Sequence, residues 1–134
     1  MGKSNGICKI CNVFEETTCH LLYECQNVYK LWSNIAKDIT KTCKSKCSIT
    51  KENVLFGMDV TNNHNIFIDF VILETKWQIW KNRNNVKYGN KQPESHNNIF
   101  KNVRKQCDLH LYTILKNAKL KKLMKSLSNY WNVS

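Results

Sequence analysis

The order of apolar and polar residues along the chain predicts a succession of helices. Over about residues 26–42, apolar side chains recur at steps of four, three and four residues, which gathers them on one face of a helix. The residues on this face are Val28, Trp32, Ile35 and Ile39. Lysines occupy other faces, so the pattern indicates an amphipathic helix that packs against a core.

The most hydrophobic stretch runs from about Asn63 to Asn84 and predicts a central, buried helix, because apolar residues occupy most of its circumference. One row of residues is expected to form the main core contact, with a second group around it. The row comprises Ile66, Phe70, Leu73, Trp77 and Trp80, and the surrounding residues are Phe67, Ile68, Val71, Ile72 and Ile79. Trp77 and Trp80 are therefore interpreted as core residues, as is Trp32.

Loops and a last helix complete the pattern. Residues 43–61 are polar and irregular and predict a loop with a short docking segment at Val54-Leu55-Phe56, and residues 88–93 predict a turn. Pro93, Glu94 and Ser95 are expected to open the last helix, because Pro and Glu suit a first helical turn. Its predicted core stripe is Phe100, Val103, Cys107, Leu111, Ile114 and Ala118. The predicted fold is all-α, with an N-terminal knuckle (residues 1–25) and a bundle of about three helices (residues 26–134) packed on it as a single compact unit.

The N-terminal segment carries the clearest chemical pattern. Cys8, Cys11, His20 and Cys25 form a C-x2-C-x8-H-x4-C array, and three thiolates with one imidazole make a ligand set that tetrahedral Zn²⁺ prefers. Four protein ligands leave no coordination position for water, so we expect one structural Zn²⁺ and not a catalytic one. The alternative interpretation is a set of scattered thiols and a surface histidine.

The spacing between His20 and Cys25 constrains the path of the backbone between them. Thr17 and Thr18 are candidate N-caps for a short helix that carries His20. Residues five apart in an α-helix point about 140° apart, so His20 and Cys25 can converge on one ion only if the backbone changes course. We predict a break near Tyr23 and Glu24.

The other cysteines have simpler interpretations. Cys19 competes with His20, but adjacent helical residues point about 100° apart and only one can face the ion. Cys43 and Cys47 offer half of a second site that would need Cys107 and His110 from another helix, and free thiols are the favoured alternative. Seven cysteines without a secretory signal favour a reducing intracellular setting, in the nucleus or the cytoplasm.

The net charge of the chain indicates which class of partner the helices could bind. The chain has 134 residues and a net charge of +11, which exceeds what solubility requires and indicates a polyanionic partner. We expect nucleic acid, either RNA or single-stranded or target DNA; the alternative is ordinary solvated lysine surface. The candidate contacts are Lys76, Lys81, Arg83, Lys87, Arg104 and Lys105, and the candidate base-stacking residues are Tyr23, Tyr88 and Trp131.

Other classes of function lack support in the sequence. No apolar run approaches the roughly 20 residues needed to span a membrane. The carboxylates form no close Asp pair of the kind that holds Mg²⁺ in a polymerase, and there is no Gly-rich loop that would cradle phosphate. We therefore expect no enzymatic activity, no small-molecule substrate and no membrane partner.

The N-terminal pattern resembles the zinc-binding (CCHC) domain at the C-terminal end of non-LTR (LINE-type) retrotransposon reverse transcriptases. The matching residues are Cys8, Cys11, Glu16, His20, Leu21, Leu22, Cys25 and Trp32, and the runs Leu55-Phe56-Gly57 and Lys76-Trp77-x-Ile79-Trp80-Lys81-x-Arg83 look like the helical tail of such proteins. The resemblance implies the same four zinc ligands and a module that holds element RNA or target DNA during target-primed reverse transcription. It also implies an upstream polymerase and endonuclease, neither of which this chain contains, so we expect a truncated copy or fragment of such an element.

A rival hypothesis is a zinc-stapled scaffold whose helices dock on the parent polymerase or a host protein through Phe67, Val71 and their neighbours. An exposed apolar patch on the central helix would favour the scaffold, whereas a continuous lysine face would favour nucleic acid.

Overall fold

A computed structural model describes residues 6–44, 46–59 and 63–115 of the chain. In chain order its elements are the π-helical turn η2 (His20–Glu24) and the α-helices α1 (Gln26–Cys43), α2 (Lys51–Phe56), α3 (Asn63–Gly89) and α4 (His96–Leu115). These described ranges contain no β-strand, only an isolated antiparallel bridge between Ile7 and Glu15. The prediction of an all-α fold is confirmed.

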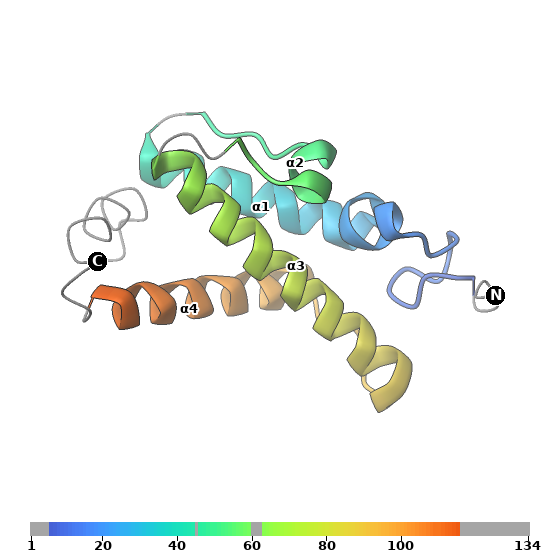
Figure 1. Ribbon diagram of the computed structural model, residues 1–134. Coiled ribbons are helices and arrows are strands. Elements are labelled where there is room, and N and C mark those ends of the chain that lie inside the picture. The colour runs from blue at the N-terminus through green and yellow to red at the C-terminus, as the bar shows by residue number, and fades with distance from the viewer. Residues whose placement is uncertain (1–5, 45, 60–62, 116–134) are drawn as a thin grey trace.

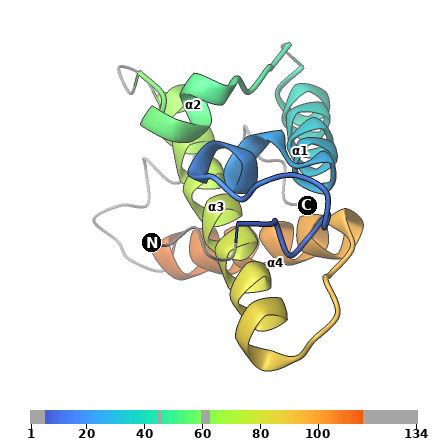
Figure 2. The same cartoon turned by 90° about the vertical axis from the view of Figure 1, so that its right-hand side faces the viewer.

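The long helices α1 and α3 both pack against α4, and α3 crosses the other two in the view of Figure 1. Both α1 and α3 contact α4, and η2 contacts α1, α2 and α3. Figure 2 looks from the N-terminal end of the bundle, where the described residues that precede α1, drawn in dark blue, lie in front of α1 and α3. The predicted knuckle therefore lies against the helices that follow it.

Helix α1 packs with the face that the sequence predicts. Val28, Trp32, Ile35 and Ile39 are all buried, together with Leu31. The indole Nε1 of Trp32 donates a hydrogen bond of 2.7 Å to the carbonyl oxygen of Leu22. This bond ties the middle of α1 back to η2 and helps to fix the angle at which the two elements meet.

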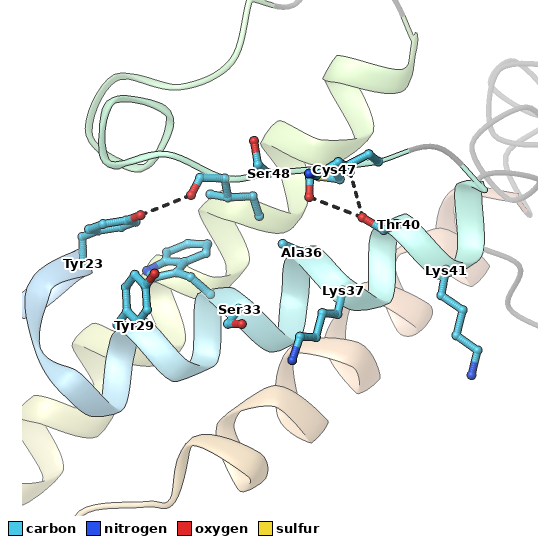
Figure 3. A pocket seen from close by; sticks show the side chains of 12 residues that line it. Tyr23, Tyr29, Ser33, Ala36, Lys37, Thr40, Lys41, Cys47 and Ser48 are labelled. Atoms are coloured by element: carbon cyan, nitrogen blue, oxygen red, sulfur yellow. Dashed lines mark hydrogen bonds between the residues drawn. The ribbon is translucent and has the colours of Figure 1, made fainter.

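The segment between α1 and α2 lies along α1 and is fastened at two points (Figure 3). The Tyr23 hydroxyl donates to the carbonyl oxygen of Ile49 over 3.4 Å, and the Cys47 amide donates to Thr40 Oγ1 over 2.8 Å. An open cavity of about 600 Å³ remains between this segment and α1. The fastening sets the position from which α2 begins.

Helix α2 matches the predicted short docking segment. Thr50 and Asn53 form a reciprocal capping box at its start, in which each side chain accepts a hydrogen bond from the backbone amide of the other. Val54 is buried, and the chain leaves the helix at Gly57 with φ of +90°. The Met58 amide then donates to Asp69 Oδ1 over 3.0 Å, which joins the end of α2 to α3.

The predicted orientation of α3 is wrong. The row Ile66, Leu73, Trp77 and Trp80, expected in the core, is exposed, and Phe70 is only half-buried. The buried face consists of Phe67, Ile68, Val71, Ile72, Thr75, Gln78, Ile79 and Asn82. The polar members of this face form hydrogen bonds, as Thr75 Oγ1 does to the Val71 carbonyl over 2.7 Å and Asn82 Oδ1 does with the Glu94 amide over 3.0 Å, so their burial is compensated.

Helix α4 begins later than the sequence predicts. The helix starts at His96, and the Ser95 side chain caps it by accepting a hydrogen bond of 3.1 Å from the Asn98 amide. Pro93 and Glu94 therefore precede the helix and do not form its first turn, and α3 continues to Gly89 instead of ending near Asn84. Val103 and Cys107 of the predicted stripe are buried, whereas the side chains of Leu111, Ile114 and Ala118 lie outside the described part of the chain.

Across the described ranges, no helix has both the length and the apolar character that a membrane crossing needs.

Candidate metal centre

Four side chains gather at the N-terminal end of the bundle. One ligand atom from each of Cys8, Cys11, His20 and Cys25 lies within 4.8 Å of the other three. The Cys8 and Cys25 sulfur atoms are 4.0 Å apart, and Cys11 Sγ is 3.4 Å from His20 Nε2. The structure thus brings together all four residues of the predicted array, and this group could hold a metal ion.

A tight turn presents the first two cysteines. The Cys8 amide donates to the Phe14 carbonyl and the Asn12 amide donates to the Cys8 carbonyl, both over 2.8 Å. Asn12 adopts a left-handed backbone conformation with φ of +58°, which Asn tolerates better than most residues. Sequence reasoning did not single out Asn12, although an Asn directly after the second cysteine is a signal for such a turn.

Thr17 positions the histidine. Its Oγ1 accepts a hydrogen bond of 3.0 Å from the His20 amide, as expected of an N-cap residue. The prediction that Thr17 or Thr18 caps the short helix is therefore confirmed for Thr17.

The backbone between His20 and Cys25 departs from an α-helix, but not in the way that the sequence predicts. The chain stays helical through Tyr23 and Glu24 as a π turn, in which the Cys25 amide donates to the His20 carbonyl over 2.8 Å. An i→i+5 hydrogen bond closes one turn between residues five apart, so it brings them toward the same face. The helix then breaks at Cys25, where ψ is 134°, and α1 begins at the next residue.

Burial makes this cluster continuous with the core. Cys8 and Cys25 are fully buried, His20 is nearly so, and Ile10 and Leu21 are buried in the same apolar cluster. The Phe14 ring lies 5.7 Å from the His20 ring. Solvent therefore has little access to the centre of the group.

The two buried sulfurs titrate as a pair. A hydrogen bond with Cys25 lowers the pKa of the Cys8 thiol to about 5, and the same bond raises the pKa of Cys25. The hydrogen bond between the two sulfurs therefore favours the ionised form of one thiol and the protonated form of the other. A cation that binds here displaces this shared proton and takes over its stabilising role.

An ion pair fastens the knuckle to α3. Arg83 Nε donates to Glu16 Oε2 over 3.0 Å, and Arg83 Nη2 donates to Glu16 Oε1 over 2.8 Å. The two side chains are only 12% and 13% exposed. The guanidinium beside Glu16 holds the pKa of that carboxyl below its usual range, and it also lies 5.0 Å from the centre of the Trp80 ring.

The group does not include Cys19, Cys47 or Cys107. Cys19 is half-buried beside His20, and its sulfur is not among the ligand atoms that gather here. Cys107 is buried in α4, and the Cys47 amide bonds to Thr40. The predicted second site would need Cys43 and His110, whose side chains lie outside the part that the structure describes.

The predicted nucleic-acid contacts fall into two kinds. Arg83 pairs with Glu16 through two nitrogens, and Arg104 Nη1 donates to both carboxylate oxygens of Asp38 at 2.9 and 3.0 Å. Both pairs join elements of the fold. The lysines Lys76, Lys81, Lys87 and Lys105 are exposed or half-exposed on α3 and α4. Contact of any of the six with nucleic acid stays a prediction. Of the stacking candidates, Tyr88 is exposed, Tyr23 is half-buried, and Trp131 lies outside the described residues.

Comparison with protein-family models, with curated proteins and with solved structures finds no match for this chain. Fold and site together define an all-α protein with an N-terminal Cys/His cluster that could hold a metal ion. The resemblance to the retrotransposon zinc-binding domain stays a prediction that rests on the sequence pattern.

Proposed function

We propose that the Cys8, Cys11, His20 and Cys25 cluster binds one structural zinc ion and that the chain is a noncatalytic nucleic-acid-binding module. In this proposal it resembles the C-terminal part of a retrotransposon reverse transcriptase and holds element RNA or target DNA, beside the parent polymerase. The observation that carries the proposal is the convergence of four soft and borderline ligand atoms in a buried, closed group.

The chemistry of the donor set supports zinc. Zn–S and Zn–N bonds of about 2.3 and 2.0 Å in a tetrahedron separate the ligand atoms by about 3.5–3.8 Å. The separations of 3.4 Å and 4.0 Å in the cluster are close to those values. Thiolates and imidazole exclude Mg²⁺ and Ca²⁺, which prefer oxygen, and a fourth protein ligand leaves no position for a reacting water.

The charge of the chain supports a polyanionic partner. There are 21 Lys and Arg residues against 10 Asp and Glu, so a large share of the cations has no carboxylate to pair with. Phosphate neutralisation by such cations releases counterions and makes the affinity fall steeply with salt.

Metal analysis tests the zinc proposal. We expect one zinc per purified chain, and Cys11→Ser to lose it because the substitution removes a ligand atom. Cys19→Ser is the matched control, since that thiol adjoins His20 but lies outside the cluster. A wild-type protein without zinc, or a Cys11→Ser variant that retains it, contradicts the proposal.

Salt-dependent binding tests the nucleic-acid proposal. Fluorescence anisotropy with labelled RNA and single-stranded DNA should show affinity that falls linearly on a double-logarithmic plot against salt concentration. Salt-insensitive binding, or no binding at low salt, would remove nucleic acid as the partner.

A second candidate is the protein-interaction scaffold, which is favoured by exposed apolar side chains in the N-terminal half of α3. Ile66 and Leu73 are 40% and 56% exposed there. The residues first expected to dock, Phe67 and Val71, are buried and cannot contact a partner. Leu73→Ser should abolish binding to the parent polymerase if the scaffold hypothesis holds, and should leave oligonucleotide affinity unchanged if the nucleic-acid proposal holds.

A further inference from the structure

The C-terminal half of α3 presents three aromatic rings to solvent. Trp77, Trp80 and Tyr88 are 54%, 43% and 72% exposed. Trp80 and Tyr88 follow Trp77 by 3 and 11 residues, which are close to whole numbers of helical turns. The three positions therefore lie within about 80° of one another around the helix and span about 16 Å along it. Figures 1 and 2 both show these turns of α3 extending past α4, away from the rest of the bundle.

Lysines accompany the rings. From Thr75 to Pro93 the chain contains no Asp or Glu but five cations, which are Lys76, Lys81, Arg83, Lys87 and Lys91. We use the name aromatic–basic face for Lys76, Trp77, Trp80, Lys81, Lys87 and Tyr88. Two neighbouring carboxylates already accept hydrogen bonds, Glu74 from Gln78 and Glu16 from Arg83. The face therefore combines exposed π surfaces with excess positive charge.

Cations hold two of the rings in place. The Arg83 guanidinium lies 5.0 Å from the centre of the Trp80 ring, and Lys87 Nζ lies 5.4 Å from the centre of the Tyr88 ring. Arg83 is itself fixed by its two hydrogen bonds to Glu16. Rings that are positioned before a ligand arrives lose less conformational entropy on binding.

Resting on the proposed function above, we infer that the aromatic–basic face binds single-stranded nucleic acid, with bases stacked on the rings and phosphates beside the lysines. Stacking on aromatic side chains requires bases whose faces are free, which a single strand offers and a duplex does not. The site would tolerate many sequences, because every base has a π face.

Other surfaces and occupants fit less well. The cavity beside α1 is also lined by Tyr23, Tyr29, Lys37 and Lys41 (Figure 3), but the Tyr23 hydroxyl already bonds to the Ile49 carbonyl and the Tyr23 and Tyr29 rings pack edge-on against each other. A second copy of a chain with a charge of +11 would bring two cation-rich faces together, which electrostatic repulsion opposes.

The test compares variants of the full zinc-loaded chain by fluorescence anisotropy with labelled oligouridylate of about 12 nucleotides. Trp77→Leu and Trp80→Leu keep an apolar side chain but remove the π surface. Each should weaken binding roughly tenfold with little change in the salt slope, given the usual strength of base stacking. Lys76→Gln and Lys81→Gln should each reduce the salt slope by about 0.7. Phe56→Leu, at an exposed aromatic residue of α2, is the matched control and should bind as wild type does.

The outcomes separate this inference from the proposed function. Salt-dependent binding that is unchanged in both tryptophan variants overturns the stacking site and leaves the module proposal standing, whereas no binding by wild type removes both. Duplex RNA that binds as tightly as oligouridylate overturns the single-strand assignment. A wild-type dimer in sedimentation that dissociates in the tryptophan variants assigns the face to self-association and also overturns it. Circular dichroism and zinc content confirm that each variant is folded.

Discussion

The ion pair between Glu16 and Arg83 predicts a measurable link between the knuckle and α3. Removal of one partner from a buried, hydrogen-bonded pair leaves the other charge without compensation, which costs about 3–5 kcal/mol when burial is complete. Here both side chains retain slight exposure, and glutamine keeps one acceptor for the guanidinium. We therefore expect Glu16→Gln to lower the free energy of unfolding by about 2 kcal/mol.

Urea unfolding of the zinc-saturated chain, at fixed free zinc, measures this change. Glu24→Gln is the matched control, because the Glu24–Lys51 pair has a similar distance of 2.9 Å but side chains that are 46% and 40% exposed. Exposed pairs contribute about 0–1 kcal/mol. A double-mutant cycle with Arg83→Gln should give a coupling energy of about 1.5 kcal/mol. Equal effects of Glu16→Gln and Glu24→Gln would refute the reasoning.

The pH dependence of this stabilisation follows from the lowered pKa of Glu16. The carboxyl is ionised in the folded and unfolded chains above its ordinary pKa of 4.5, so the stabilisation is fully present at neutral pH. It is lost as the pH falls through the lower pKa of the folded state. The difference in stability between wild type and Glu16→Gln should therefore be constant above about pH 5.5 and shrink in acid.

Three further predictions concern the helices. Trp32→Phe removes the hydrogen bond to the Leu22 carbonyl and should cost about 1–3 kcal/mol in urea unfolding, whereas Trp77→Phe, at an exposed position, should cost little. Gly57→Ala should destabilise the chain by about 1–2 kcal/mol, because φ of Gly57 is +90° and the new Cβ would lie 3.1 Å from Asp69 Oδ1. Gly89→Ala is the control for a thermal melt and should be neutral or stabilising, because the new Cβ would have no atom nearer than 3.9 Å. Burial raises the pKa of the Cys107 thiol to about 12, so mass spectrometry should find it unreacted with iodoacetamide until the chain is unfolded, while Cys19 reacts in the folded state.

The sequence is informative where polar and apolar residues separate cleanly around a helix. On α1 one narrow apolar stripe is flanked by lysines, and the predicted residues are all buried, together with Leu31. The gathering of the four Cys and His residues was likewise predictable, because their spacing along the chain is typical of a metal-ligand set.

Helix α3 shows where sequence reasoning fails. Its apolar residues surround the axis, so hydrophobic periodicity does not determine which face is buried. The buried face carries Thr75, Gln78 and Asn82. Thr75 and Gln78 bond one turn back within α3, to Val71 and Glu74, and Asn82 accepts a hydrogen bond from the Glu94 amide in the segment before α4. These hydrogen bonds compensate for the burial of the three polar side chains, and Trp77 and Trp80 lie on the exposed face instead.

The π turn of η2 also limits which spacings the metal site can accept. Removal of one residue between His20 and Cys25 would leave a four-residue step, which an ordinary α-helix places only about 40° apart, so the ligands could still share a face. Insertion of one residue would give a six-residue step, which places the two side chains about 120° apart on an α-helix, so their convergence would again need a departure from α-helical geometry. Between His20 and Cys25 the chain should therefore accept contraction with an ordinary α-helix, whereas expansion would need a different distortion of the backbone.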